Sequence, residues 1–423
     1  LRNSLSFADH LRYLDYATTQ FHTDYPISET DYVKGVAGKP EYYFVIGVCG
    51  DDAYWAIDRD KQLTITGTGA IADFESDYHG TIEAVAPWWF WQDGFNKVVI
   101  EKSITHIGEN AFYGMENITS AVLPDTLLEI GGSAFEKCSG LTKINFPSKL
   151  ELICHSAFYE CRKLTKADIP ASVKKIDTWA FRDCVALKTL TLREGLEYIG
   201  NGAFDSCAIT KLVIPDSVTR LESPFDGCSK LESVKVGASV KIIPGYSFSN
   251  CTSLTRVELP EGLQAIHPAA FDGCTALPEI TIPASVTEVD GFSRCKNLKK
   301  ITFCGDAPSI GYYAFSGVTA TAYYPDNSDS WTEDVMQDYG GALTWKTAEA
   351  ISIKTQPKTG YAKMGETVKV SVKAEGDGLK YQWYIKNAGA SKYSKSSITS
   401  STYSVTMTDK VKDRRVYCVV TDA

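Results

Sequence analysis

The sequence lacks most of the signals that mark enzymes, metal sites and membrane spans. Its 423 residues include only six histidines, and these share no common position. No run of about 18 or more apolar residues occurs, so no transmembrane helix is predicted. CxxC pairs, Cys/His clusters, glycine-rich phosphate loops and GxSxG elbows are all missing. We therefore predict no catalytic residue, no bound metal and no cofactor.

A concentrated excess of basic charge is missing as well. The net charge is −9, whereas nucleic-acid binders present a strongly basic face, so we predict no nucleic-acid partner. The charge is distributed unevenly, because residues 349–423 hold 13 Lys+Arg against 7 Asp+Glu, and the other 348 residues hold 30 against 45. This asymmetry indicates a domain boundary near residue 348.

What the sequence does contain is a strict internal repeat. Ten phenylalanines, most of them preceded by Ala, follow one another at intervals of 23 residues, with two intervals of 21. They are Phe112, Phe135, Phe158, Phe181, Phe204, Phe225, Phe248, Phe271, Phe292 and Phe315. A fixed period of this length indicates a solenoid, in which each coil contacts only its neighbours.

Each repeat has the same internal order. An L-x-x-I-x-I strand such as 141–146 comes first, with its apolar residues pointing inward and the residues between them pointing outward. A proline often ends this strand, because proline has no N–H for a strand ladder. A second apolar pair and the Ala-Phe-x-x-Cys turn follow. We predict about ten parallel strands, with the phenylalanines in the core.

Eight of the twelve cysteines lie three residues after these phenylalanines. They are Cys138, Cys161, Cys184, Cys207, Cys228, Cys251, Cys274 and Cys295. One cysteine per coil is typical of a small apolar residue stacked along an interior ladder, so we predict free, buried thiols. Disulfides between coils are the alternative, because coils about 5 Å apart fall within the range that a bridge allows.

The two ends of the array differ from the repeats. Residues 1–41 read as an amphipathic helix over 1–21 followed by an irregular segment. Residues 42–111 are expected to form an N-terminal cap of short strands, which a solenoid needs to cover its apolar end. This cap holds Trp88, Trp89 and Trp91, an aromatic block that could stack on a sugar or plug the end of the core.

The closing stretch after the last repeat allows two further interpretations. Residues 326–329, Asp-Asn-Ser-Asp, are reminiscent of a calcium loop but lack its glycine and its distal glutamate. We expect them instead to end a strand and to precede a short helix over 332–339, with Glu333 in its first turn.

The repeat phrase 157–176, AFYECRKLTKADIPASVKKI, resembles the BspA-type leucine-rich repeat, and nearly every other repeat does too. The flanks CGDD at 49–52 and LTITGTG at 63–69, and the segment from residue 319 to Trp345, resemble the caps of such arrays. The resemblance covers about residues 45–346. It implies a right-handed leucine-rich repeat solenoid with two caps, in a secreted or surface-displayed bacterial protein of a family associated with adhesion.

Residues 347–423 read as a separate β-sandwich. Five short alternating strands resemble an immunoglobulin-like domain, with Trp383 as the buried ring of its core. The resemblance is broken where Val372 stands in place of the expected cysteine, so Cys418 should be unpaired. The sequence stops within a strand-like run, and we expect this domain to be truncated.

One outward column of the solenoid is mostly basic. It is formed by the residues that precede the middle inward residue of each strand, and our candidate ligand-binding residues in it are Lys143, Lys166, Lys211, Arg256 and Lys300. Such a column could bind an anionic glycan or an acidic protein segment. The plainer interpretation is a solvated face on which lysines keep the sheet soluble.

The four expected parts are thus residues 1–41, a cap at 42–111, repeats with a closing cap at 112–346, and an immunoglobulin-like domain at 347–423. Together they predict a mainly β, monomeric, non-enzymatic cell-surface binding protein without membrane insertion in this chain. Its ligand would be a protein or a glycan on the strand face. The alternative hypothesis is a structural stalk without a specific ligand.

Overall fold

The computed structural model describes residues 43–58, 60–74, 86–348, 352–358, 362–375 and 379–421. The helix expected over residues 1–21 lies outside these residues. The chain divides into two compact units. The first comprises Leu1–Ala322 with Asp329–Trp345, and the second comprises Tyr323–Ser328 with Lys346–Ala423.

The first unit begins with an antiparallel meander. Strands β1 (Tyr43–Val48) and β2 (Asp52–Asp58) pair with each other, and β2 pairs with β3 (Gln62–Ala70). The strand β3 then pairs in parallel with β4 (Lys97–Ile100), so it joins the meander to the repeats. A short 3-10 helix, η4 (Trp89–Gly94), precedes β4.

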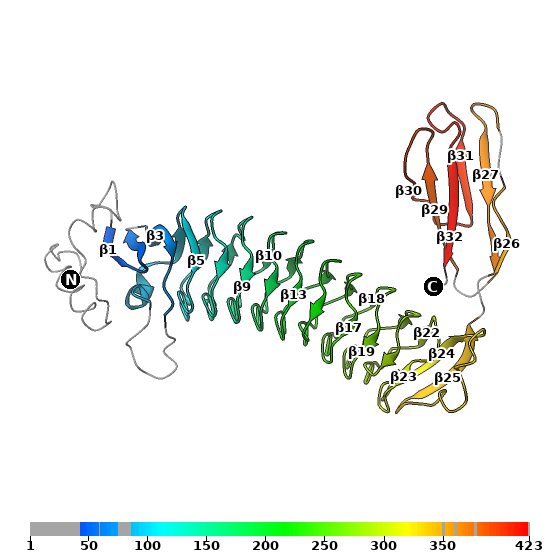
Figure 1. The fold of residues 1–423 in the computed structure, drawn as a ribbon, viewed down its shortest axis with the longest axis horizontal. Coiled ribbons are helices and arrows are strands. Elements are labelled where there is room, and N and C mark those ends of the chain that lie inside the picture. The colour runs from blue at the N-terminus through cyan, green and yellow to red at the C-terminus, as the bar shows by residue number, and fades with distance from the viewer. Residues whose placement is uncertain are drawn as a thin grey trace. The chain divides into compact units, whose positions relative to one another are not determined.

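Ten coils follow, and the first strand of each confirms the predicted stack of parallel strands (Figure 1). They are β4, β6 (Ser120–Val122), β8 (Lys143–Ile144), β10 (Lys166–Asp168), β12 (Thr189–Thr191), β14 (Lys211–Val213), β16 (Ser233–Lys235), β18 (Arg256–Glu258), β20 (Glu279–Ile282) and β22 (Lys300–Phe303). In β10 the middle residue Ala167 is buried while Lys166 is exposed, as the alternation of a half-buried strand requires.

Each coil also contributes a second, shorter strand, where the sequence indicated only an apolar pair. These are β5 (Ile104–Ile107), β7 (Glu129–Ile130), β9 (Leu152–Ile153), β11 (Lys175–Ile176), β13 (Tyr198–Ile199), β15 (Arg220–Leu221), β17 (Ile242–Ile243), β19 (Ala265–Ile266), β21 (Glu288–Val289) and β23 (Ser309–Ile310). They pair in parallel, for example Lys175 with Tyr198. The solenoid therefore has two strand faces.

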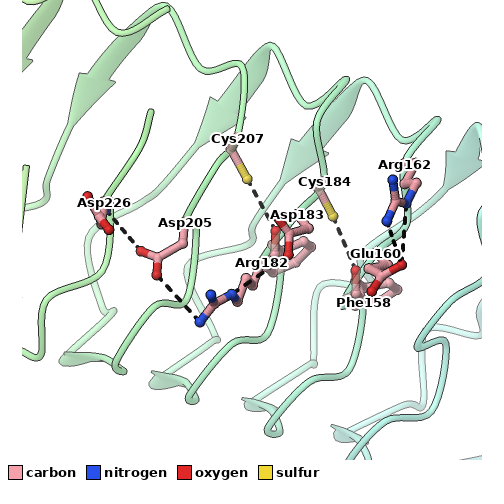
Figure 2. Close-up of polar contacts among 10 residues, drawn as sticks. Phe158, Glu160, Arg162, Arg182, Asp183, Cys184, Asp205, Cys207 and Asp226 are labelled. Carbon is pink, nitrogen blue, oxygen red and sulfur yellow. Dashed lines mark hydrogen bonds and ion pairs between the residues drawn. The ribbon is translucent and has the colours of Figure 1, made fainter. Parts of the chain in front are cut away.

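The core between these faces is a column of stacked phenylalanine rings. From Phe112 to Phe315 neighbouring rings lie 4.8–5.8 Å apart and their planes are nearly parallel. All eight repeat cysteines are free and buried, which confirms the prediction of an interior thiol ladder. Each Sγ donates to the carbonyl of the phenylalanine in the preceding coil, as Figure 2 shows for Cys184 and Phe158 at 3.2 Å.

The array closes with β24 (Thr319–Pro325) and β25 (Ala342–Ala348). The helix expected over 332–339 is wrong, because the amides of Val335 and Met336 both donate to the Thr332 carbonyl and no further helical turn follows. Packing explains the difference: Trp331 and Trp345 both lie against Phe303, with ring centroids 4.8 and 5.8 Å from its ring. Long-range burial of two indoles overrides a weak local helix preference.

The second unit contains seven short strands in three small antiparallel sheets. They are β26 (Ser352–Thr355), β27 (Thr367–Ser371), β28 (Lys373–Glu375), β29 (Lys380–Lys386), β30 (Ser394–Lys395), β31 (Thr402–Thr406) and β32 (Arg415–Thr421). Its core is Trp383, Val372 and Tyr403. As expected, Trp383 is fully buried and Cys418 is unpaired. The immunoglobulin-like assignment stays a prediction.

Candidate functional site

Strand pairing places the predicted basic column in register. Lys97, Ser120 and Lys143 are successive partners in β4, β6 and β8, and Lys211, Ser233 and Arg256 repeat this order in β14, β16 and β18. Lys166 pairs with Thr189 and Glu279 pairs with Lys300. A serine thus separates Lys97 from Lys143 and Lys211 from Arg256, so these charges lie about 10 Å apart, close to the screening length of physiological salt. Between Arg256 and Lys300 the column holds the acidic Glu279 instead.

The pairing is interrupted between Lys143 and Lys166, which belong to separate sheets. Asn145, which follows β8, bonds through its side chain to the coil of β6 instead: its Nδ2 donates to the Leu123 carbonyl, and the Leu123 amide donates to its Oδ1, both at 2.8 Å. The strand β8 is accordingly only two residues long. No ladder fixes the spacing of Lys143 and Lys166, although they hold the same position in consecutive coils.

Neighbouring groups distinguish the five candidate residues. Arg256 forms an ion pair of 2.8 Å with Glu258 on its own strand, which cancels much of its charge. Lys300 is half-buried and interacts with other groups. Within the part of the chain that the structure describes, Lys143, Lys166 and Lys211 are exposed and have no ion pair within 4.0 Å. Of the five candidates, these three lysines carry charge that no ion pair among the described residues compensates, as does Lys97 at the start of the column.

The aromatic block of the cap divides into a core residue and two partly exposed ones. Trp88 is fully buried, and its Nε1 donates to the Ala111 carbonyl at 2.8 Å. A buried indole cannot stack on a ligand, so the interpretation of Trp88 as part of a sugar platform is corrected to that of a core plug. Trp89 and Trp91 are half-buried and both have interaction partners.

The second strand face carries a compensated network that sequence analysis missed. Tyr198 lies between Lys175 and Arg220, with each cation 5.3 Å from the centre of its ring. Its hydroxyl donates to Glu222 at 2.7 Å, and burial together with this hydrogen bond raises the pKa of Tyr198 to about 12. The period of 22 to 23 residues could have aligned these residues, but their mutual contacts depend on side-chain direction. Since every charge in it is paired, we assign this network to stability.

A third cluster lies along the turns that follow the phenylalanines (Figure 2). Arg182 Nη1 lies 3.9 Å from Asp205 Oδ2, and Asp205 Oδ1 accepts the Asp226 amide at 2.9 Å. Burial, and then the charge of Asp226, raise the pKa of Asp205 to about 6. The cluster therefore combines a guanidinium with carboxylates that are partly shielded from water.

Metal binding and membrane insertion find no support among the described residues. No group of three or more His, Cys, Asp or Glu side chains in these ranges is arranged to hold a metal ion. No helix found there has the length and apolar character needed to span a bilayer.

Several solved bacterial structures resemble this chain. A leucine-rich cell surface protein from Faecalibacterium prausnitzii aligns with 20% identity over 74% of this chain and 97% of its own, at a TM-score of 0.37. A leucine-rich repeat protein from Bacteroides ovatus aligns with 20% identity over 70% and 99%, at 0.37. The pneumococcal vaccine antigen PcpA aligns with 16% identity over 72% and 94%, at 0.31. No curated protein sequence matches the chain.

The family model of the BspA type leucine rich repeat region matches in six copies. The matches span residues 89–153, 105–224 and 222–330, which together make up more than half of the 423 residues. They coincide with the coils that carry the phenylalanine and cysteine ladders. The chain therefore belongs to the BspA-type leucine-rich repeat family.

Proposed function

We propose that this protein is a non-enzymatic binding protein displayed at a bacterial surface, and that the first strand face of its solenoid binds an acidic segment of a protein partner. The observation that carries the proposal is the register of the basic column, in which Lys143 and Lys211 project from paired strands without an ion-pair partner in the described residues. Family membership supports surface display.

The arrangement suits an extended acidic ligand. From Lys97 to Arg256 the cations are separated by Ser or Thr except at the consecutive Lys143 and Lys166, and they form a shallow strip rather than a pocket. Hydroxyl groups between the cations can donate hydrogen bonds to carboxylates, and the cations attract them over about one screening length. Exposed charges of this kind act mainly on the association rate, so binding should weaken as salt is added.

The unit from Lys346 onward is proposed to be an immunoglobulin-like spacer. Its supporting features are the antiparallel pairing of β29 with β32 and the fully buried Trp383.

The test compares two charge-reversal variants of the whole chain. Lys143→Glu with Lys211→Glu changes the column, whereas Lys163→Glu with Lys230→Glu makes the same charge change at exposed lysines in turns. Immobilised extracellular matrix proteins, polyglutamate and sulfated glycans serve as probes. We expect the column variant to lose at least tenfold in affinity for a protein probe without a lower melting temperature, while the turn variant binds normally.

Three results would contradict the proposal. If the column variant binds as tightly as the wild type, the first strand face is not the binding site. Binding to sulfated glycans with no binding to proteins or polyglutamate assigns the face to a different ligand class. Absence of binding to every probe favours the alternative hypothesis of a structural stalk.

A further inference from the structure

Two aromatic side chains occupy a backbone position where the fold imposes a left-handed conformation. In eight coils the residue two before the core phenylalanine has φ between 50° and 60°. These residues, which we call the left-handed column, are Asn110, Ser133, Ser156, Trp179, Gly202, Ser223, Tyr246 and Ala269. Six of the eight are small or are Asn, which tolerates this region, whereas Trp179 and Tyr246 are bulky.

These two residues combine a strained backbone with large exposed rings. A bulky side chain at positive φ is disfavoured by about 1–2 kcal/mol relative to the right-handed region. Burial does not compensate fully, because Trp179 is 43% exposed and Tyr246 is 60% exposed. Other large residues of the chain, such as Lys137 and Arg294, also have positive φ, so the exposed aromatic ring is what sets Trp179 and Tyr246 apart. Strained backbone with an exposed aromatic ring is a feature from which a binding surface can be hypothesised.

The two aromatic residues enclose two small ones. Gly202 and Ser223 lie between them in the left-handed column, so Trp179 and Tyr246 are three coils, or about 15 Å, apart. A Cβ atom built on Gly202 would lie 2.6 Å from Trp179 Cδ1 and 2.9 Å from Asp205 Oδ2. The indole and the Asp205 carboxylate therefore both lie against Gly202, and any larger side chain there would force at least one of them to shift.

Polar groups lie next to Trp179 and Gly202, and Figure 2 shows three of them. They are Arg182, Asp205 and Asp226, and Asn250 adds an amide that donates to Asp226 Oδ1 at 3.1 Å. These four side chains include strong hydrogen-bond donors and strong acceptors, and the Arg182 guanidinium lies near the Asp205 carboxylate. Hydroxyl-rich ligands can exchange hydrogen bonds with every one of these groups.

We propose that Trp179 and Tyr246 form the two ends of a binding site for a neutral oligosaccharide, with Arg182, Asp205 and Asp226 bonding its hydroxyl groups. Partly exposed aromatic rings can stack on the apolar faces of pyranose rings, and the distance between the two aromatic residues suits a short chain of sugars. The site lies at the turns rather than on the strand face, so it does not depend on the proposed acidic protein ligand.

A cationic peptide is the competing ligand, since it too could use aromatic rings and carboxylates. The structure argues against a cationic peptide because Arg182 already occupies the position that a ligand cation would take, 5.7 Å from the Trp179 ring and 3.9 Å from Asp205. Neutral hydroxyl groups do not compete with that guanidinium.

The test screens the whole chain against an array of neutral, sialylated and sulfated oligosaccharides and of Lys- and Arg-rich peptides, followed by calorimetry with the strongest hit. Trp179→Asn with Tyr246→Asn introduces the residue that the same column holds at position 110. We expect this variant to lose at least tenfold in affinity for a neutral oligosaccharide. Tyr246→Asn alone should lose part of that affinity and keep the wild-type melting temperature, because Tyr246 is mostly exposed.

Two controls separate this site from other surfaces. Tyr312→Asn removes a 77% exposed aromatic residue outside the site and should leave binding unchanged. Lys143→Glu with Lys211→Glu should also leave it unchanged, which separates this site from the strand face. The proposal is overturned if no neutral oligosaccharide binds, if Tyr246→Asn binds as the wild type does, or if peptides alone bind in a Trp179-dependent way.

Discussion

Trp88 lies face to face with Phe112, with ring centroids 5.3 Å apart and planes inclined by 21°. The indole thereby continues the phenylalanine column into the N-terminal cap. Trp55 and Phe74 meet its edges at 6.1 and 5.8 Å in T-shaped contacts. A solenoid must cover its apolar end, and here one buried ring connects the cap to the first coil.

Replacing Trp88 should therefore uncouple the cap. Trp88→Ala leaves a large cavity, and we expect a loss of about 3–5 kcal/mol in the free energy of unfolding, measured by denaturant titration. Trp88→Phe preserves stacking but loses the hydrogen bond to Ala111, so it should cost less than Trp88→Ala. Tyr312→Ala, at an exposed position, is the control and should change stability by less than about 0.5 kcal/mol. Equal losses for the two Trp88 variants would argue against the stacking role.

The buried thiol ladder should be chemically inert in the folded protein. Burial raises the pKa of Cys161, Cys184 and Cys207 far above its ordinary range, so the reactive thiolate is not populated near neutral pH. We expect alkylating reagents at pH 8 to leave the eight repeat cysteines unmodified, and to modify all of them after unfolding in guanidinium. Peptide-resolved mass spectrometry measures this directly. Rapid modification of Cys184 in the native protein would contradict the ladder.

The carboxyl group of Asp205 should make stability decrease as pH rises. Its folded-state pKa of about 6 lies above the ordinary value of 3.8, so the folded state binds a proton that the unfolded state has already released in this window. The contribution of Asp205 to the free energy of unfolding should therefore fall between about pH 4 and pH 6.5.

The variant Asp205→Asn isolates this effect. It should be more stable than the wild type at pH 7.5 by on the order of 1 kcal/mol, and the advantage should disappear near pH 4. The exposed Asp125→Asn serves as the control. Thermal unfolding at both pH values measures the difference, and an advantage that is the same at both would exclude titration of Asp205 as its cause.

The Tyr198 network should stabilise the second strand face in two separable parts. Tyr198→Phe loses the hydrogen bond to Glu222 and should cost about 1 kcal/mol. Tyr198→Leu also removes the contacts with Lys175 and Arg220, and should cost a further 0.5–1 kcal/mol or so. Urea titrations of both variants give the two values. If the Leu variant is no less stable than the Phe variant, the cation–π contacts contribute nothing.

Much of the solenoid follows from the period alone. A spacing of 23 residues places Phe135 directly on Phe112, because each coil must present the same residue to the same core position as its neighbour. The same argument places Cys161 beside the Phe135 carbonyl and aligns Lys211 with Ser233 and Arg256. The second strand ladder has the same register, but its strands are mostly two residues long, too short to show an alternation in sequence.

Tertiary structure decided which of these side chains are buried, which form ion pairs and which are exposed. The sequence by itself determined the stacked coils, the phenylalanine and thiol ladders and the column of basic residues, because identical residues at a fixed period must stack. Only the structure showed that Arg256 is paired with Glu258, that Trp88 is buried, and that Trp179 and Tyr246 are exposed on left-handed backbone. Such properties depend on rotamers and on neighbours from adjacent coils, and no period in the sequence specifies those.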